Sequence, residues 1–187
     1  MADLYDTTKQ NISSHIKNIF DEEELAMDST VKEFLTVQKE GNRSDKMLTV
    51  NLGGTCGNSN WRESLIKLLN PNIKYFNPLV KDWKYTESTK LEKKQRMQAS
   101  DILLYVITPE QMGFSAIASA VDYSNKVPNK LVFCVLYEYN DMKMEGHMLE
   151  SIKSVEDIIK DNGCITFNSL TDVANYLNNV AINRESH

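Results

Sequence analysis

The sequence has few cysteines and no long apolar run, and each shortage excludes a class of protein. Cys56, Cys134 and Cys164 are odd in number, far apart and without CxxC spacing. They predict reduced thiols, not a disulfide framework or a zinc site. No stretch approaches the ~20 apolar residues of a transmembrane helix, and the first residues do not resemble a signal peptide. We expect a soluble cytoplasmic protein that binds no membrane, metal or cofactor.

Positive charge is scarce at the N-terminus. Residues 1–46 carry six Lys/Arg against ten Asp/Glu, so they hold most of the net charge of −5 of this 187-residue chain. Nucleic-acid affinity rests largely on neutralising phosphates. A nucleic-acid partner is therefore not expected.

Residues 1–46 form the first of two predicted units. Their apolar side chains recur at helical spacing, at Ile12, Ile16, Ile19 and Phe20, and the polar stretch 39–45 indicates a linker. We expect a short helical N-terminal extension.

The second unit, residues 47–187, alternates apolar strand patterns with helical ones. Strands are expected near residues 48–52, 74–76, 102–107, 131–136 and 164–167, the first ending before Gly53-Gly54. This order predicts a flavodoxin-like, Rossmann-like three-layer α/β/α fold with a five-stranded, mainly parallel sheet. Ligands of such folds bind beyond the carboxyl ends of the strands, so the loops there are the candidate site.

The expected helices carry recognisable ends. Asn60 and Glu63 fit a capping box, Ser169 with Asp172 fits the start of the last helix, and Gly163 fits a C′ position. The helix after Thr108-Pro109 has one apolar face, formed by Phe114, Ile117, Ala118 and Val121.

Two of the strand-end loops could bind a ligand. Glycines after the first strand would let the backbone approach a ligand, although the loop fits neither the P-loop nor GxGxxG. Its candidate binding residues are Gly53, Gly54, Thr55, Cys56 and Trp61. The second loop offers Asn77, Pro78 and Trp83, and an aromatic side chain there could stack on a base. The alternatives are a tight strand-to-helix turn and aromatic side chains that only cover the core.

Four motifs in this order resemble the nucleoside 2-deoxyribosyltransferase-like family. They are Gly53–Trp61, Phe76-Asn77-Pro78 with Asp82-Trp83, Ala99-Ser100-Asp101, and Pro109-Glu110. The resemblance implies a nucleoside or nucleotide ligand and a glycosyltransferase or hydrolase reaction at the N-glycosidic bond. It also implies a homo-oligomer whose site crosses a subunit interface. A carboxylate of such an enzyme attacks the anomeric carbon and a second acid protonates the departing base.

The resemblance places the nucleophilic Glu of the family at Ser119, or in an alternative register at Ala118, and neither is a carboxylate. A serine hydroxyl is a weak nucleophile without an adjacent base. The family's acid position falls on Glu92, which also fits a solvated helix face. Asp101 fits the Ala-Asp or Ser-Asp pair of the family and is a candidate catalyst, but a structural role in binding backbone N–H groups is the stronger expectation.

Other residues near the third strand end are further candidates. Glu110 lies nearer the expected mouth than Asp122 and could replace the missing carboxylate, or could be an exposed turn residue. Met112 and Phe114 could line the ligand pocket or belong to the core or the surface.

Residues 4–20 and 29–41 resemble the start of RhuM-type virulence-associated proteins. In that family the stretch resembles a helix-turn-helix, but here we expect a fused fragment used in packing or self-association. Three functions are thus carried forward: a deoxyribosyltransferase or nucleoside hydrolase, a catalytically silent nucleoside- or nucleotide-binding domain, and a DNA-associated regulator acting through the N-terminal segment.

Overall fold

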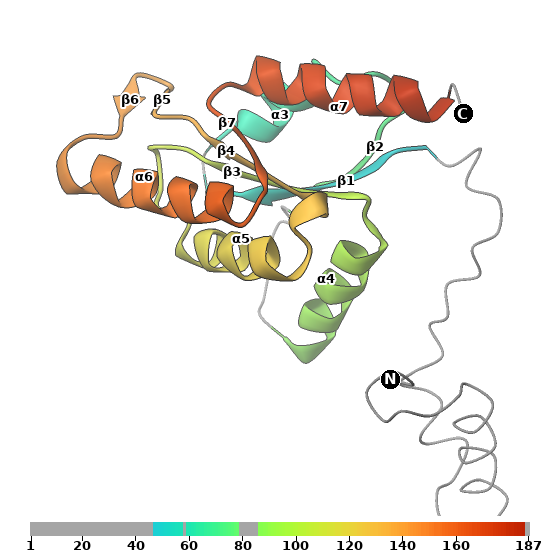
Figure 1. Ribbon diagram of the computed structural model, residues 1–187, viewed down its shortest axis with the longest axis horizontal. Helices are drawn as coiled ribbons and strands as arrows, with labels where there is room; N and C mark the ends of the chain where they lie inside the picture. The colour runs from blue at the N-terminus through green and yellow to red at the C-terminus, as the bar shows by residue number, and fades with distance from the viewer. Residues whose placement is uncertain (1–46, 58, 79–85, 186–187) are drawn as a thin grey trace, which may run out of the picture. The chain divides into compact units, whose positions relative to one another are not determined.

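Five parallel strands form the centre of the described structure, a computed structural model that describes residues 47–57, 59–78 and 86–185 (Figure 1). The strands are β1 (Thr49–Gly54), β2 (Lys74–Phe76), β3 (Ile102–Ile107), β4 (Leu131–Val135) and β7 (Ile165–Phe167). Their order is β2-β1-β3-β4-β7, with every neighbouring pair parallel. This confirms the predicted flavodoxin-like sheet. The predicted N-terminal extension lies outside the described residues.

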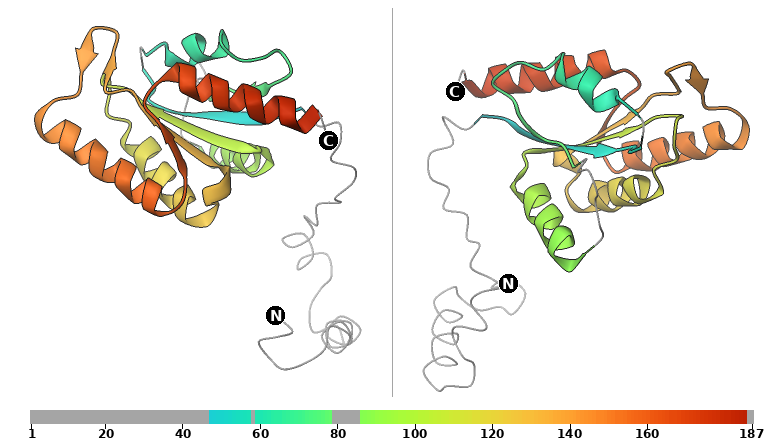
Figure 2. Two further views of the ribbon diagram at one scale, coloured as in Figure 1. Left: turned by 45° about the horizontal axis from the view of Figure 1, so that its top comes forward. Right: turned by 180° about the vertical axis from the view of Figure 1, so that it is seen from behind.

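Helices cover both faces of this sheet. One face carries α3 (Trp61–Ile66) and α7 (Leu170–Glu185). The other carries α4 (Glu87–Ala99), α5 (Phe114–Lys126) and α6 (Gly146–Asp161), and Figure 2 shows the two layers from other directions. A 3-10 turn, η3 (Pro128–Lys130), precedes β4. Among the described residues, none of the helices has both the length and the apolar character needed to cross a bilayer.

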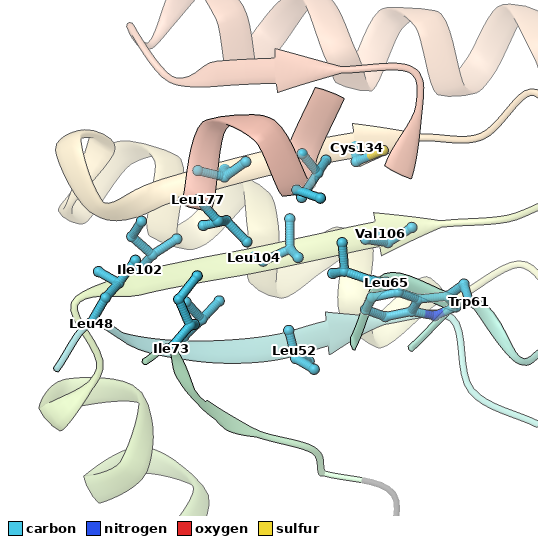
Figure 3. Close-up of a cluster of buried hydrophobic side chains, with 14 of the residues drawn as sticks. Leu48, Leu52, Trp61, Leu65, Ile73, Ile102, Leu104, Val106, Cys134 and Leu177 are labelled. Atoms are coloured by element: carbon cyan, nitrogen blue, oxygen red, sulfur yellow. The ribbon is translucent and has the colours of Figure 1, made fainter. Parts of the chain in front are cut away.

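The core has two halves because side chains alternate along each strand. Leu104 and Val106 of β3 point toward α3 and α7, where they meet Leu52, Leu65 and Trp61 (Figure 3). Leu103, Tyr105 and Ile107 of the same strand face the opposite helical layer. All six residues of β3 are buried, which accounts for its uninterrupted apolar sequence.

The predicted helix ends were right in two cases and wrong in one. The Ser169 hydroxyl accepts from the backbone N–H of Asp172 (3.1 Å), and Gly163 follows α6 with φ +84°. The Asn60–Glu63 capping box is wrong. Asn60 precedes α3 but makes no side-chain cap. The side-chain oxygen of Asn60 instead accepts hydrogen bonds from a hairpin far along the sequence, and these bonds replace the cap.

That hairpin was not predicted. It consists of β5 (Glu138–Tyr139) and β6 (Met142–Lys143), which pair antiparallel after β4. Asn140 and Asp141 form its turn with φ +48° and +61°. Asn and Asp tolerate the left-handed region better than most residues, so this pair was the available sequence signal.

The predicted apolar face of α5 is partly wrong. Phe114 is 75% exposed and Ala118 is exposed, whereas Ala120 and Ser124 are buried. Ser124 can occupy the buried face because its hydroxyl donates to the backbone oxygen of Val121 (2.8 Å) and accepts from Asn162 (2.8 Å). Hydrophobic periodicity alone gives no sign that a polar residue is buried here.

Candidate functional site

The carboxyl ends of β1 and β3 form the topological switch point of this sheet. The chain leaves β1 toward α3 on one face and leaves β3 toward α5 on the other (Figure 1). Doubly wound folds bind ligands at such a point.

The two glycines that end β1 have reasons internal to the fold. A Cβ at Gly53 would lie 2.8 Å from two ring carbons of Tyr105, and one at Gly54, where φ is +125°, would lie 2.0 Å from the Val106 oxygen. β1 therefore includes both glycines, whereas the sequence predicted that the strand ends before them. Close packing of β1 on β3 requires these glycines whether or not a ligand approaches.

Thr55 ties the two strand-end loops together. Its hydroxyl accepts from the backbone N–H of Thr108 (2.9 Å) and donates to the backbone oxygen of Gln111 (3.4 Å). Thr55 is fully buried. This predicted binding residue is therefore engaged within the protein.

Arg62 of α3 binds the same loop, and this role was not predicted from the sequence. Its guanidinium, in a residue only 1% exposed, donates to the backbone oxygens of Leu52 (3.0 Å), Thr55 (2.7 Å) and Gly54 (3.3 Å). Burial lowers its pKa, while Cys56 works in the opposite direction. No carboxylate pairs with this cation in the described ranges. An arginine in the first turn of a helix resembles a solvated residue, so the sequence carries no signal of its burial.

Trp61 and Cys56 differ in their exposure to solvent. Trp61 is fully buried in the core (Figure 3), where its indole N–H donates to the Thr55 oxygen (2.9 Å). Cys56 is exposed, with its sulfur 3.5 Å from the Gly54 oxygen. Of these two predicted binding residues, only Cys56 presents its side chain to solvent.

Tyr105 brings an unsatisfied polar group beside Ser119. The residue is 2% exposed, and its hydroxyl has no hydrogen-bond partner among the described residues. Burial raises the pKa of this hydroxyl and Tyr123 adds to the rise, while Ser119 lies close enough to act in the opposite direction. The geometry between the two hydroxyls does not make a hydrogen bond. Ser119, the predicted nucleophile position, thus adjoins a buried donor without an acceptor.

Glu110 lies in a second polar group at the same strand ends. Its carboxylate accepts from the Thr108 hydroxyl (3.1 Å) and from the amide of Asn140 (2.8 Å). Burial works to raise the pKa of this carboxyl. Hydrogen bonds from Ser59, Asn140 and Thr108 outweigh burial and hold the pKa below its ordinary value. Glu110 is therefore an ionised, oriented carboxylate.

Glu92 lies on the outer face of α4. It forms an exposed ion pair with Arg96, whose guanidinium stacks on the Phe76 ring at the end of β2, 4.1 Å from the ring centre. Nothing in the described structure joins Glu92 to Ser119 or Tyr105.

Asp101 precedes β3 and so lies at the edge opposite the strand ends. Its carboxylate accepts from the backbone N–H (3.0 Å) and hydroxyl (2.7 Å) of Thr49 and pairs with Arg184 (2.9 Å). Burial works to raise its pKa, but the hydrogen bonds from Arg184 and Thr49 outweigh burial and lower it. These contacts give Asp101 the structural role that was the stronger expectation.

The remaining candidates are dispersed. Asn77 and Pro78 follow β2 and are half-buried, Met112 is half-buried, and Phe114 begins α5 with its ring in solvent. Trp83 lies outside the described residues. Within the described ranges, no three His, Cys, Asp or Glu side chains gather where a metal ion could be held.

Comparison with known proteins agrees with the resemblance of the motifs. Residues 47–139 match the family described as nucleoside 2-deoxyribosyltransferase like. The match begins after the N-terminal segment and gives no support to the RhuM-type resemblance of residues 4–41. No curated protein matches the chain. Residues 47–139, which hold β1 through β4 and end inside the hairpin, are therefore similar to the nucleoside 2-deoxyribosyltransferase-like family.

Proposed function

We propose that this chain binds a 2′-deoxynucleoside or its nucleotide at the carboxyl ends of β1 and β3, beside Tyr105 and Ser119. The family match supplies the ligand class. The observation that carries the location is the buried Tyr105 hydroxyl, which has no hydrogen-bond partner in the described part of the chain.

An unpaired buried hydroxyl costs about 1–3 kcal/mol, and folded proteins satisfy nearly all such groups. A polar atom of a ligand entering beside Ser119 would accept from Tyr105 and remove that cost. The site therefore gains more from a ligand than a fully satisfied site would.

Binding need not lead to chemistry, because Ser119 is not a carboxylate. Attack on the anomeric carbon needs an activated nucleophile. Tyr105 cannot act as the base near neutral pH, since burial raises its pKa and keeps it protonated. His147, the one histidine among the described residues, is exposed in α6. We accordingly propose a binding domain without base exchange.

A second candidate, cleavage or exchange of the N-glycosidic bond, is favoured by one observation. The lowered pKa of Glu110 keeps a carboxylate ionised at the switch point. In that case Glu110 would attack the anomeric carbon. Glu92, the acid position of the family, would have to leave its ion pair with Arg96 on the outer face of α4 to protonate the departing base.

One experiment separates the candidates. The full chain is incubated with 2′-deoxyadenosine or 2′-deoxyinosine and a second free base, and products and thermal stability are both measured. A stability gain without exchange supports the binding domain, because a ligand that binds only the folded state stabilises it. Exchange abolished by Glu110→Gln or Glu92→Gln supports the enzyme, and no stabilisation with any nucleoside or nucleotide contradicts both.

A reconstruction tests the assignment of Ser119. Ser119→Glu restores a carboxylate beside the Tyr105 hydroxyl and should produce measurable exchange; Ser115→Glu, one turn earlier on the same helix, is the matched control. No gain in the first variant contradicts Ser119 as the nucleophile position. We also infer a homo-oligomer from the family resemblance, which light scattering on the purified chain tests.

A further inference from the structure

The tip of the β5–β6 hairpin makes contacts that the proposed function does not use. Asn140 donates its amide both to Glu110 (2.8 Å) and to the side-chain oxygen of Asn60 (3.1 Å). Glu110 belongs to the loop after β3 and Asn60 to the loop after β1. One side chain thus joins both loops of the switch point.

The neighbouring Tyr139 anchors the hairpin in the same place. Its hydroxyl donates to the Asn60 oxygen (2.8 Å) and lies 3.1 Å from the Ser64 hydroxyl in α3. Two side chains, Tyr139 and Asn140, therefore bind the hairpin tip to the β1 loop. These contacts fix the position of Asn140 independently of its bond to Glu110.

The backbone of the turn is compatible with Asn140. Asn140 and Asp141 both have positive φ, a conformation that Asn and Asp tolerate better than most residues. Glycine also suits such a turn, but it would remove the donor to Glu110. A glycine at residue 140 therefore separates the contribution of the amide from that of the turn.

Glu110 retains capacity to accept further hydrogen bonds. A carboxylate has about four lone-pair sites, and three donors, from Ser59, Asn140 and Thr108, act on this one. The residue is only half-buried, so a ligand can reach it. An ionised acceptor at the switch point suits a hydroxyl donor better than an anionic group.

We propose that Asn140 is a positioning residue that holds the Glu110 carboxylate to accept a hydrogen bond from a sugar hydroxyl of the bound nucleoside. The proposal rests on the proposed function, because it names the part of the same ligand that Glu110 binds. Hydrogen bonds to ionised acceptors are roughly twice as strong as neutral ones. Loss of this bond should therefore lower the affinity by a measurable amount.

The first test compares two probes, 2′-deoxyadenosine and adenine, by calorimetric titration of the full chain. Glu110→Gln should weaken binding of 2′-deoxyadenosine by about tenfold and leave adenine unchanged, since adenine carries no sugar. Equal effects on both probes, or no effect on either, overturn the sugar contact while leaving nucleoside binding intact. Failure of the unaltered chain to bind either probe overturns this proposal together with the proposed function.

The second test concerns Asn140 itself. Asn140→Gly keeps a residue that tolerates positive φ and removes only the amide; Asp141→Gly makes the matching change at the next residue. Carboxyl-carbon NMR titration should show the pKa of Glu110 rising in the first variant and not in the second, with weaker binding of 2′-deoxyadenosine only in the first.

Asn140→Asp provides a variant of the same shape that places a second carboxylate beside Glu110. It should raise the pKa of Glu110 further and weaken binding more, because like charges repel. A Glu110 pKa and an affinity that stay unchanged in both Asn140 variants overturn the positioning role.

Discussion

The ring of Tyr105 rests directly on the backbone of Gly53, so that a methyl group at residue 53 would lie 2.8 Å from two ring carbons. The two residues also face each other across paired strands. The position of the Tyr105 hydroxyl beside Ser119 thus depends on the absence of a side chain on the neighbouring strand.

Gly53→Ala should therefore displace Tyr105. Overpacking of a close-packed site costs about 1–3 kcal/mol, and the displaced hydroxyl should no longer meet the ligand, so both the unfolding midpoint and nucleoside affinity should fall. Gly113→Ala is the control, because its methyl group would make ordinary contacts at 3.4 Å or more. Unchanged stability and affinity in Gly53→Ala would show that Tyr105 is not held in this way.

Arg62 should be among the least replaceable residues of the site. Arg62→Lys removes the planar fork that donates to the backbone oxygens of Leu52, Gly54 and Thr55. The Thr55 oxygen keeps its bond from Trp61, and each oxygen left unsatisfied costs about 1–3 kcal/mol. Denaturant unfolding should show a loss above about 2 kcal/mol. Arg96→Lys, at a partly exposed ion pair, should lose less than about 1 kcal/mol; equal losses would contradict the buried role of Arg62.

Asp101 should make stability depend on pH at the acid end. Its pKa is lowered in the folded state, so its contribution is present above the unfolded value of about 3.9 and is lost as pH falls through the folded value. The difference in unfolding free energy between the unaltered chain and Asp101→Asn should thus be steady near neutral pH and shrink in acid. A difference independent of pH would contradict the paired carboxylate. Asp122→Asn, at an exposed ion pair, is the control.

Much of the fold was predictable because it follows from local pattern. The apolar run of β3 and the Ser169–Asp172 start of α7 both depend on residues adjacent in sequence. A continuous apolar run predicts a strand buried on both faces, and side-chain capping predicts a helix start, from neighbouring residues alone.

The site was less predictable because its key contacts are distant in sequence. The Asn140–Glu110 hydrogen bond spans 30 residues, and hydrogen bonds from Tyr139 and Asn140 to Asn60 replace the local cap expected of Asn60. The buried Arg62 is satisfied by backbone oxygens that cannot be predicted from the sequence. Phe114 was assigned to a core-facing apolar face, but the structure turns its ring to solvent. Each error concerns which long-range partner outcompetes a local preference.

If the proposed function is right, a bound nucleoside or nucleotide accepts a hydrogen bond from the buried Tyr105 hydroxyl. The most direct test is calorimetric titration of the unaltered chain and of Tyr105→Phe with 2′-deoxyadenosine and its 5′-monophosphate, beside thermal unfolding without ligand. We predict that Tyr105→Phe is at least as stable as the unaltered chain, because it removes a buried hydroxyl that no described residue pairs with, yet binds about tenfold more weakly. Equal affinity in the two proteins, or no binding by the unaltered chain, would contradict the account.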